Sequence, residues 1–352
     1  MKITTIIGAR PQFIKAAIVS RAFREYQSEI LEVLVHTGQH YDADMSDVFF
    51  DELDIPRPNY NLGIGGGTHG QNTGRMIEAV EAVLLKEKPD WVLVYGDTDS
   101  TLAGALAAAK LHLPVAHIEA GLRSFNRKMP EELNRIIADH LSTLLFTPTD
   151  TATRNLATEG ISGDKVQQVG DVMYDAALYY RNKAQRPKNI KVSSGFILFT
   201  LHRAENTDRS ERLSNIIGVL NEVAGETPVI LPLHPRTRKL LNQGAYDVSK
   251  ITMLPPVSYL EMVWLLEHCK MVVTDSGGLQ KEAYFFGKKC VTTRDETEWR
   301  ELVESGWNVL AGASHERITT SICNAALPPS EQFPFYGTGT AGQSIVKQLR
   351  SF

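Results

Sequence analysis

Short β-rich runs alternate with longer helical patterns along most of this 352-residue chain, and this alternation constrains the fold more than any other feature. In the first half, runs such as ITTII, LEVLVHT, WVLVYGD and PVAHIEA are separated by helical patterns, for example at 11–25, near 45–53 and at 101–111. A strand–helix–strand succession requires crossover connections, so the strands run parallel and helices cover both faces of the sheet. The sequence therefore predicts an α/β fold.

Two segments interrupt the alternation. The glycine-rich segment 63–74 is predicted to be the most mobile loop, because glycine tolerates many backbone conformations. The polar segment 181–195 is predicted to be a linker, because the pattern restarts after it with FILFTLH and PVILPLH. We therefore predict two Rossmann-like, doubly wound domains at 1–172 and 190–340. Ligands bind beyond the carboxyl ends of such strands, so both domains should turn these ends toward a cleft.

Composition excludes several classes of protein. The net charge is −4 and no basic tail stands out, so we expect no nucleic-acid partner. The three scattered cysteines indicate reduced thiols rather than a disulfide framework or a zinc site. The N-terminus does not resemble a signal peptide, and the apolar segment STLAGALAAAKLHLP is too short to span a bilayer. We expect a soluble cytoplasmic protein.

The turn Gly-Ala-Arg-Pro follows the first predicted strand. It places Arg10 at a helix N-terminus, where backbone N–H groups favour anions and a guanidinium can hold a phosphate. A surface arginine beside an ordinary turn is the alternative. The turn lacks the Gly-x-Gly-x-x-Gly fingerprint of dinucleotide-binding proteins, and the chain has no Walker sequence, so we expect no cofactor.

The segment TDSGGLQKEA contains a second candidate phosphate site. A strand is predicted to end at Asp275 and a helix to begin near Leu279. The Ser-Gly-Gly between them offers a hydroxyl and unhindered N–H groups at the positive end of that helix, which suits a diphosphate. Glu282, about one turn further, could accept hydrogen bonds from a ribose diol. An ordinary Ser-Gly-Gly turn with a helix cap is the alternative.

Acidic residues follow strands or begin a helix in the first half. In YGDTDST, either Asp97 or Asp99 is predicted to cap a helix while the other faces the cleft. Glu119 follows the strand in PVAHIEA. Pro130 begins a helix whose first turn contains Glu131, although acidic side chains there also suit the helix dipole. These carboxylates are candidates for proton transfer.

Histidines also lie near predicted strand ends. His202 follows the first strand of the second half, and LPLHPR offers His234 and Arg236 to a phosphate or uridine. The segment HTGQHYDAD has nitrogen and oxygen ligands that could imitate a metal site. Those residues are His36, His40, Asp42 and Asp44. A turn and a helix cap explain them as well, so we expect no metal.

Seven motifs occur in order over almost the whole chain: GARPQFIK, HTGQHY, GDTDST, HIEAGLRS, MPEELNR, HRAEN and TDSGGLQKEA. Together they resemble the non-hydrolysing UDP-N-acetylglucosamine 2-epimerase family. The resemblance implies a GT-B fold with a UDP-sugar cleft, a homodimer, and a final helix at 343–352 that returns to the first domain. It also implies the interconversion of UDP-GlcNAc and UDP-ManNAc, without a cofactor, for surface polysaccharide precursors.

The resemblance also implies roles for individual residues. The catalytic set is Asp97, Glu119, Glu131 and His202. The UDP site is Arg10, His234, Arg236, Ser276, Gly277, Gly278 and Glu282, with Lys15 and Arg135 in support. Met262 departs from the family, because many members carry an aromatic residue there that can lie against uracil. QKEAYFFGKKCVTTRDETEW resembles members that act on UDP-2,3-diacetamido-2,3-dideoxy-glucuronic acid, which is the alternative substrate.

The implied reaction needs these residue types because the C2 hydrogen of the sugar is not beside a carbonyl. Breaking the C1–O bond makes that hydrogen acidic and yields UDP and a glycal, which carboxylates near C1 and C2 can promote. We expect Arg123 and Arg135 to hold Glu119 and Glu131, or the substrate. A GT-B glycosyltransferase, a hydrolysing epimerase and a non-catalytic nucleotide-sugar sensor are alternatives. The acidic cluster of the first half favours the epimerase over the transferase.

Overall fold

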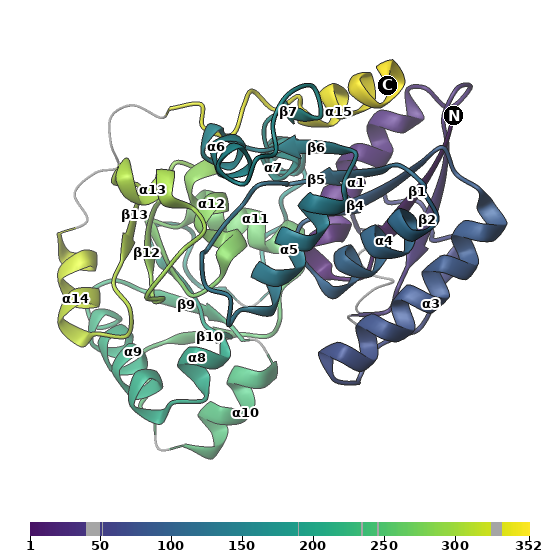
Figure 1. Ribbon diagram of the computed structural model, residues 1–352. Coiled ribbons are helices and arrows are strands. Elements are labelled where there is room, and N and C mark those ends of the chain that lie inside the picture. Colours follow the sequence, from purple (N-terminus) through teal and green to yellow (C-terminus); the bar gives the residue numbers. More distant parts are fainter. Residues whose placement is uncertain (40–49, 51, 189, 234, 245, 325–332) are drawn as a thin grey trace. The chain divides into compact units, whose positions relative to one another are not determined.

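The computed structural model describes residues 1–39, 50, 52–188, 190–233, 235–244, 246–324 and 333–352 (Figure 1). The chain forms two compact units. The N-terminal unit comprises Met1–Ala176 and Pro334–Phe352, and the C-terminal unit comprises Ala177–Phe333. The division falls inside helix α7 (Val172–Arg181), so the segment 181–195 belongs to the C-terminal unit. Each unit contains a parallel sheet, which confirms the predicted α/β fold with two doubly wound sheets.

The sheet of the N-terminal unit has the strand order β3-β2-β1-β4-β5-β6-β7 in its described part. Its strands are β1 (Lys2–Ile7), β2 (Leu31–His36), β3 (Tyr60–Asn61), β4 (Trp91–Tyr95), β5 (Val115–Ile118), β6 (Leu144–Thr147) and β7 (Val166–Gln168). The chain runs outward from β1 to β3 and returns to β4 on the other side of β1. The switch point therefore lies at the carboxyl ends of β1 and β4, where open α/β sheets bind ligands.

Small residues let helix α4 (Asp99–Lys110) pack closely on this sheet. A Cβ atom on Gly104 would lie 3.0 Å from Val94 Cγ1 and 3.2 Å from Ile6 Cγ1. The alanines on the same side of the helix are buried, so this alanine-rich segment belongs to the core. In the described part of the unit, the helices with assigned bounds are α1 (Arg10–Arg24), α3 (His69–Glu87), α4 (Asp99–Lys110), α5 (Pro130–Leu141), α6 (Asp150–Thr158) and α15 (Ala341–Ser351), with the first half of α7.

The prediction of a loop throughout 63–74 was wrong, because helix α3 begins at His69 and contains Gly70 and Gly74. A capping box starts the helix: the Thr68 hydroxyl accepts from the Gln71 N–H at 3.4 Å, and the Gln71 side chain accepts from the Thr68 N–H at 3.2 Å. Satisfying two helix-end donors offsets the cost of about 1 kcal/mol for each glycine in the helix. The helix predicted near 45–53 lies mostly outside the described residues.

The C-terminal helix α15 returns to the N-terminal unit and packs on α1. Its first turn is capped from a distant element, because Asp175 Oδ2 in α7 accepts from the Gly342 N–H at 2.8 Å. At its other end, Arg350 Nη2 donates to Glu29 Oε2 at 2.6 Å. The segment before the helix runs close to Gly170, where an added Cβ atom would lie 2.8 Å from the Tyr336 carbonyl oxygen.

The C-terminal unit repeats the architecture with the strand order β10-β9-β8-β11-β12-β13. Its strands are β8 (Ile197–Thr200), β9 (Val229–Pro232), β10 (Thr252–Leu254), β11 (Met271–Thr274), β12 (Lys289–Thr292) and β13 (Asn308–Leu310). Its helices are α8 (Ala204–Thr207), α9 (Ser210–Val223), α10 (Pro235–Gln243), α11 (Tyr259–His268), α12 (Gly277–Phe285), α13 (Arg300–Glu304) and α14 (His315–Cys323). The switch point of this sheet lies at the carboxyl ends of β8 and β11.

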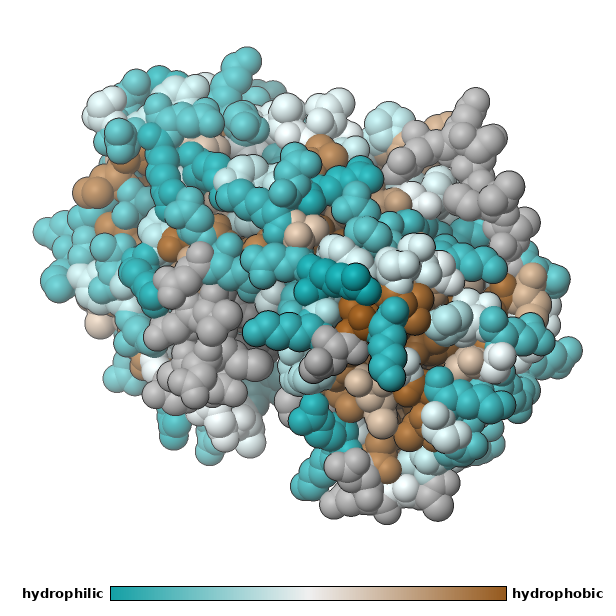
Figure 2. All heavy atoms as spheres, turned by 180° about the vertical axis from the view of Figure 1, so that it is seen from behind, coloured by the Kyte–Doolittle hydropathy of each residue, from teal (hydrophilic) through white to brown (hydrophobic). Residues whose placement is uncertain are grey.

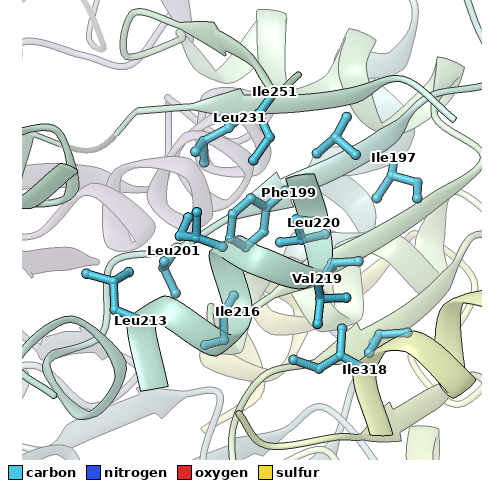
Figure 3. Packing of buried hydrophobic residues seen from close by; sticks show 14 of the residues in the cluster. Ile197, Phe199, Leu201, Leu213, Ile216, Val219, Leu220, Leu231, Ile251 and Ile318 are labelled. Carbon is cyan, nitrogen blue, oxygen red and sulfur yellow. The ribbon is translucent and has the colours of Figure 1, made fainter. Parts of the chain in front are cut away.

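Alternate residues of β8 enter cores on opposite faces of this sheet. Phe199 and Leu201 pack with α9 residues such as Ile216 (Figure 3). Leu198 enters the opposite core, against which Met262 of α11 also packs. Burying one such large apolar side chain contributes about 1.5–3 kcal/mol. The two cores explain why the strand reads as a continuous apolar run, as strands covered on both faces do.

Hydrophilic side chains cover most of the face that Figure 2 shows. An apolar patch interrupts this hydrophilic surface. In the part of the chain that the structure describes, every helix is too short or too polar to cross a membrane.

Candidate active site

Two of the predicted carboxylates follow neighbouring strands of the N-terminal unit. Tyr95 at the end of β4 pairs with Ile118 at the end of β5. Asp97 and Glu119 come one or two residues later, so both lie at the carboxyl edge of the sheet. Gly96, which lies between β4 and Asp97, is hydrogen-bonded to the end of β5, because its N–H donates to the Ile118 carbonyl oxygen at 2.9 Å. The fold thus brings together the two acidic residues that the sequence places at these strand ends.

Asp97 forms an ion pair with Arg135 of α5. The same guanidinium donates through Nη1 to Glu132 Oε2 at 2.9 Å, so it lies between two carboxylates. Asn134 Nδ2 donates to the Asp97 carbonyl oxygen at 3.0 Å. Arg135 was expected to hold Glu119, Glu131 or the substrate, and its ion pairs are to Asp97 and Glu132. It therefore holds the side chain of Asp97 against α5.

The N-cap of α4 is Thr98, so the prediction that Asp97 or Asp99 caps this helix was wrong. The Thr98 hydroxyl accepts from the Thr101 N–H at 3.4 Å, which leaves both aspartates for other contacts. Asp99 is buried in the first turn of α4 and lies 2.9 Å from Nδ1 of His69. A threonine with extended backbone dihedrals caps as an aspartate does, and three consecutive cap-forming residues made the sequence ambiguous.

Glu119 is held in an unusual backbone conformation. Its φ angle is +70°, in the left-handed region that a side chain with a Cβ atom rarely adopts and that costs of order 1–3 kcal/mol. Its carboxylate pairs with Lys15 of α1, and the two side chains are 9% and 7% exposed. Its N–H donates to the Phe146 carbonyl oxygen at 3.1 Å. The neighbouring strand and helix α1 therefore impose the strain, and they aim this carboxylate at Lys15.

A buried network that the sequence did not predict lies beneath the two carboxylates. His117 Nε2 lies 2.7 Å from the Gly96 carbonyl oxygen, and Nδ1 lies 2.7 Å from Asp139 Oδ1. Asp139 Oδ2 accepts from the Gly121 N–H at 3.1 Å and from Arg123 Nη1 at 2.7 Å. The network thus joins the residue before Asp97 to a residue two positions after Glu119.

Arg123 was expected to hold Glu119, Glu131 or the substrate, and the structure shows different partners. Besides Asp139, it donates through Nε and Nη2 to Glu159 at 2.7 and 2.8 Å. Burial by itself raises the pKa of Asp139, but the hydrogen bonds and charges of His117 and Arg123 hold that pKa below its ordinary value. Two sequence features could have indicated this network: His117 lies inside an apolar strand, and Asp139 lies on the buried side of α5.

The first turn of α5 contains two glutamates with different surroundings. Glu132 is buried and accepts from the Ser124 N–H at 2.9 Å and the Phe125 N–H at 2.8 Å, so it anchors the loop that precedes the helix. Glu131, the predicted catalytic residue, is partly exposed. Pro130 begins the helix as predicted.

The predicted phosphate-binding turn of the N-terminal unit surrounds a glutamine side chain. Gln12 Oε1 accepts from the N–H groups of Gly8 and Ala9 at 2.8 and 3.0 Å. These two donors are therefore already satisfied by the protein. A phosphate role for this turn depends on Arg10, which begins α1 and is partly exposed.

In the C-terminal unit, helix α12 begins at Gly277, two residues before the predicted start. Ser276 is the N-cap, and its hydroxyl accepts from the Leu279 N–H at 3.4 Å, which leaves its own O–H to donate. A Cβ atom on Gly277 would lie 2.3 Å from Glu298 Oε1, whereas one on Gly278 would meet nothing within 4 Å. A side chain at 277 would therefore displace the Glu298 carboxylate, whereas position 278 borders open space.

His202 lies at the end of β8, and Nδ1 of its ring is 3.1 Å from Asp275 Oδ1. The Asp275 carboxylate is fully buried and also accepts from the N–H groups of His202 and Arg203. Burial alone raises the pKa of Asp275, but the hydrogen bond and charge of His202, with these N–H groups, hold it below its ordinary value. The sequence singled out His202, and its aspartate partner was missed.

For several predicted residues the structure describes no side chain. His234 is not among the described residues, and Arg236 belongs to α10 without a described side chain. Of the metal-like segment, His40, Asp42 and Asp44 also lie outside them. Among the residues that are described, no group of three or more histidine, cysteine, aspartate or glutamate side chains could hold a metal ion.

Comparison with known proteins finds full-length similarity. A family model described as UDP-N-acetylglucosamine 2-epimerase matches residues 23–350. The UDP-2,3-diacetamido-2,3-dideoxy-D-glucuronate 2-epimerase of Pseudomonas aeruginosa is 55% identical, with 99% of each chain covered. The UDP-N-acetylglucosamine 2-epimerase of Methanocaldococcus jannaschii is 42% identical, also with 99% of each chain covered.

Solved structures agree with these sequence similarities. The M. jannaschii enzyme, in complex with UDP-GlcNAc and UDP, has a TM-score of 0.91 at 42% identity, with 100% of each chain covered. The Neisseria meningitidis UDP-GlcNAc 2-epimerase bound to UDP-GlcNAc has a TM-score of 0.91 at 33% identity, again with full coverage. The predicted GT-B fold is confirmed by these matches.

Proposed function

The chain belongs to the UDP-N-acetylglucosamine 2-epimerase family, and from this premise we propose that it inverts C2 of a UDP-2-acetamido sugar by elimination and re-addition of UDP. Enzymes of this family are isomerases. The environment and backbone conformation of Glu119 support the proposal most strongly. A mostly buried carboxylate in a strained conformation, paired with Lys15 and beside the strand that precedes Asp97, suits a proton-transfer site better than a surface salt bridge.

In the proposed reaction the C1–O bond breaks, and its electron pair stays on the β-phosphate oxygen. A carboxylate of the N-terminal unit removes the C2 proton, which leaves a C1–C2 double bond in the glycal. A proton then returns to the opposite face of C2, and UDP adds back to C1. Asp97, Glu119 and Glu131 are proposed for these proton transfers and for stabilising positive charge at C1. No electrons are exchanged with another molecule.

We propose that the C-terminal unit binds UDP through the start of α12 and through Glu282, which is buried in that helix. Glu282→Ala should weaken the binding of free UDP by about 1.5–3 kcal/mol, the range for hydrogen bonds to a charged group. Isothermal titration calorimetry measures this directly, with the exposed Glu226→Gln as a control that should bind UDP normally. Unchanged affinity in the Glu282 variant would place the uridine diphosphate elsewhere.

The identity of the sugar is a separate part of the proposal. UDP-GlcNAc and UDP-2,3-diacetamido-2,3-dideoxy-D-glucuronate share the 2-acetamido group and the C2 hydrogen that the reaction requires. The 55% identity to the P. aeruginosa enzyme, against 42% to the M. jannaschii enzyme, favours the glucuronate. The ratio of kcat/KM for the two substrates decides between them. We further propose a homodimer located in the cytoplasm, which sedimentation and cell fractionation would test.

Deuterium incorporation tests the reaction itself. When either UDP-sugar is incubated with the protein in D2O, mass spectrometry should show one deuterium in the epimer and in recovered substrate, because the C2 proton exchanges with solvent. Proton NMR should show loss of the C2 signal. Epimer without deuterium would exclude proton transfer at C2. A UDP-sugar left unchanged at C2 would favour the glycosyltransferase or the sensor.

A further inference from the structure

The His202 imidazole and the N-terminus of α12 both lie at the switch point of the sheet in the C-terminal unit. Thr200 of β8 and Thr274 of β11 are paired in register, and their hydroxyl oxygens are 2.5 Å apart. His202 and Ser276 each come two residues after this pair. The imidazole and the N-terminus of α12 therefore lie at the ends of adjacent strands, and Asp275 lies between them in sequence and in space.

Asp275 is the centre of this arrangement. Its buried carboxylate accepts from the His202 N–H with both oxygens, at 3.1 and 3.0 Å, and from the Arg203 N–H at 2.9 Å. Asn206 Nδ2 lies 3.4 Å from Asp275 Oδ2 and donates to the Thr293 carbonyl oxygen at 2.9 Å. The loop that carries His202 is thus held to the end of β11 by hydrogen bonds that need an acceptor at 275. Asn206 holds it to the end of β12 through the Thr293 carbonyl oxygen.

The same carboxylate determines which nitrogen of His202 carries a proton. An ionised carboxylate has no hydrogen to donate, so the contact of 3.1 Å to Nδ1 requires an N–H on Nδ1. Nε2 is then the nitrogen that gains or loses a proton. The His202 side chain is 35% exposed whereas Asp275 is fully buried, so a ligand reaches the imidazole and not the aspartate.

We propose that Asp275 is a positioning residue that fixes the tautomer and orientation of His202, so that Nε2 acts on the diphosphate of the departing UDP. The inference rests on the proposed function. When the C1–O bond breaks, Nε2–H gives its proton to the β-phosphate oxygen that takes the electron pair. When this oxygen adds back to C1, the proton returns to Nε2. Asp275 stays ionised throughout and acts through His202.

A double-mutant cycle tests whether Asp275 acts through His202. Asp275→Asn should lower kcat by about 10²–10⁴-fold, the range for loss of a positioned acid or base. In a His202→Gln background, the same substitution should change kcat by less than about 3-fold, because the group it positions is gone. An equal loss in both backgrounds would overturn the proposal. Asp247→Asn is the matched control, since this carboxylate accepts from the Ser249 N–H in the same unit and should leave kcat unchanged.

Nuclear magnetic resonance provides a test that does not depend on activity or on folding of a variant. Long-range ¹H–¹⁵N correlation on the unmodified protein should show neutral His202 with its proton on Nδ1 and a lone pair on Nε2. The opposite tautomer would overturn the proposal even if the enzyme is active. If the unmodified protein shows the expected tautomer but inverts no UDP-sugar, the proposed function fails while the role of Asp275 in setting the His202 tautomer stands.

Discussion

Glu119→Gln should lower kcat by about 10²–10⁴-fold and leave the affinity for UDP nearly unchanged, because glutamine keeps the size of the side chain but removes its negative charge and its basicity. The carboxylate is 9% exposed and pairs with Lys15. A group with so little exposure has limited contact with bulk water, so its chemistry depends mainly on the fixed partners around it. Steady-state rates for the epimerisation, with calorimetry for UDP, measure the two effects separately.

The control for this substitution must separate chemistry from stability. Removing the charge of Glu119 leaves the Lys15 ammonium buried without its carboxylate, so some loss of melting temperature is expected. Rates should therefore be compared well below the melting temperature of each variant. Glu25→Gln changes an exposed glutamate of the same unit and should behave as the unmodified protein. Near-normal turnover in Glu119→Gln would make this residue a structural partner of Lys15.

Asp139→Asn should lower the free energy of unfolding by about 3–5 kcal/mol, the cost of breaking a buried ion pair by removing one partner. The carboxylate accepts hydrogen bonds from His117 and Arg123, and all three side chains are at least nine-tenths buried. An asparagine amide in its place would direct N–H donors at groups that already donate. Urea unfolding at neutral pH, with the exposed Asp164→Asn as a control, measures the difference.

The pH dependence of this difference has a defined sign. The folded protein holds the pKa of Asp139 below its ordinary value, so this group's stabilisation is fully present above the unfolded pKa of about 3.8 and is lost as pH falls through the lower folded pKa. The gap in stability between the unmodified protein and Asp139→Asn should therefore be constant above about pH 5 and shrink below about pH 4. A gap that widens on acidification would contradict the assignment of Asp139 as an ionised partner.

The sequence alone determined the α/β class, the two parallel sheets and the family. These follow from local information: period and length of the apolar runs identify strands and helices, and seven motifs identify the family. The position of Glu119 and His202 at strand ends also follows, because the carboxyl ends of parallel strands share one edge. The start of α3 was missed, since two glycines in its first turns concealed a capping box that depends on Thr68 and Gln71.

The tertiary structure alone decided which groups hold the side chains that we propose to be reactive. His117 and Asp139 are 22 residues apart, and His202 and Asp275 are 73 residues apart, so neither pair leaves a local pattern. The partner of Arg123 was predicted wrongly for the same reason, because a guanidinium can reach any carboxylate within a turn or two. The packing of α5 on β5 selects Asp139 as the partner of His117, and the register of β11 on β8 selects Asp275 as the partner of His202. Both carboxylates are buried, and an unpaired buried charge would cost too much free energy.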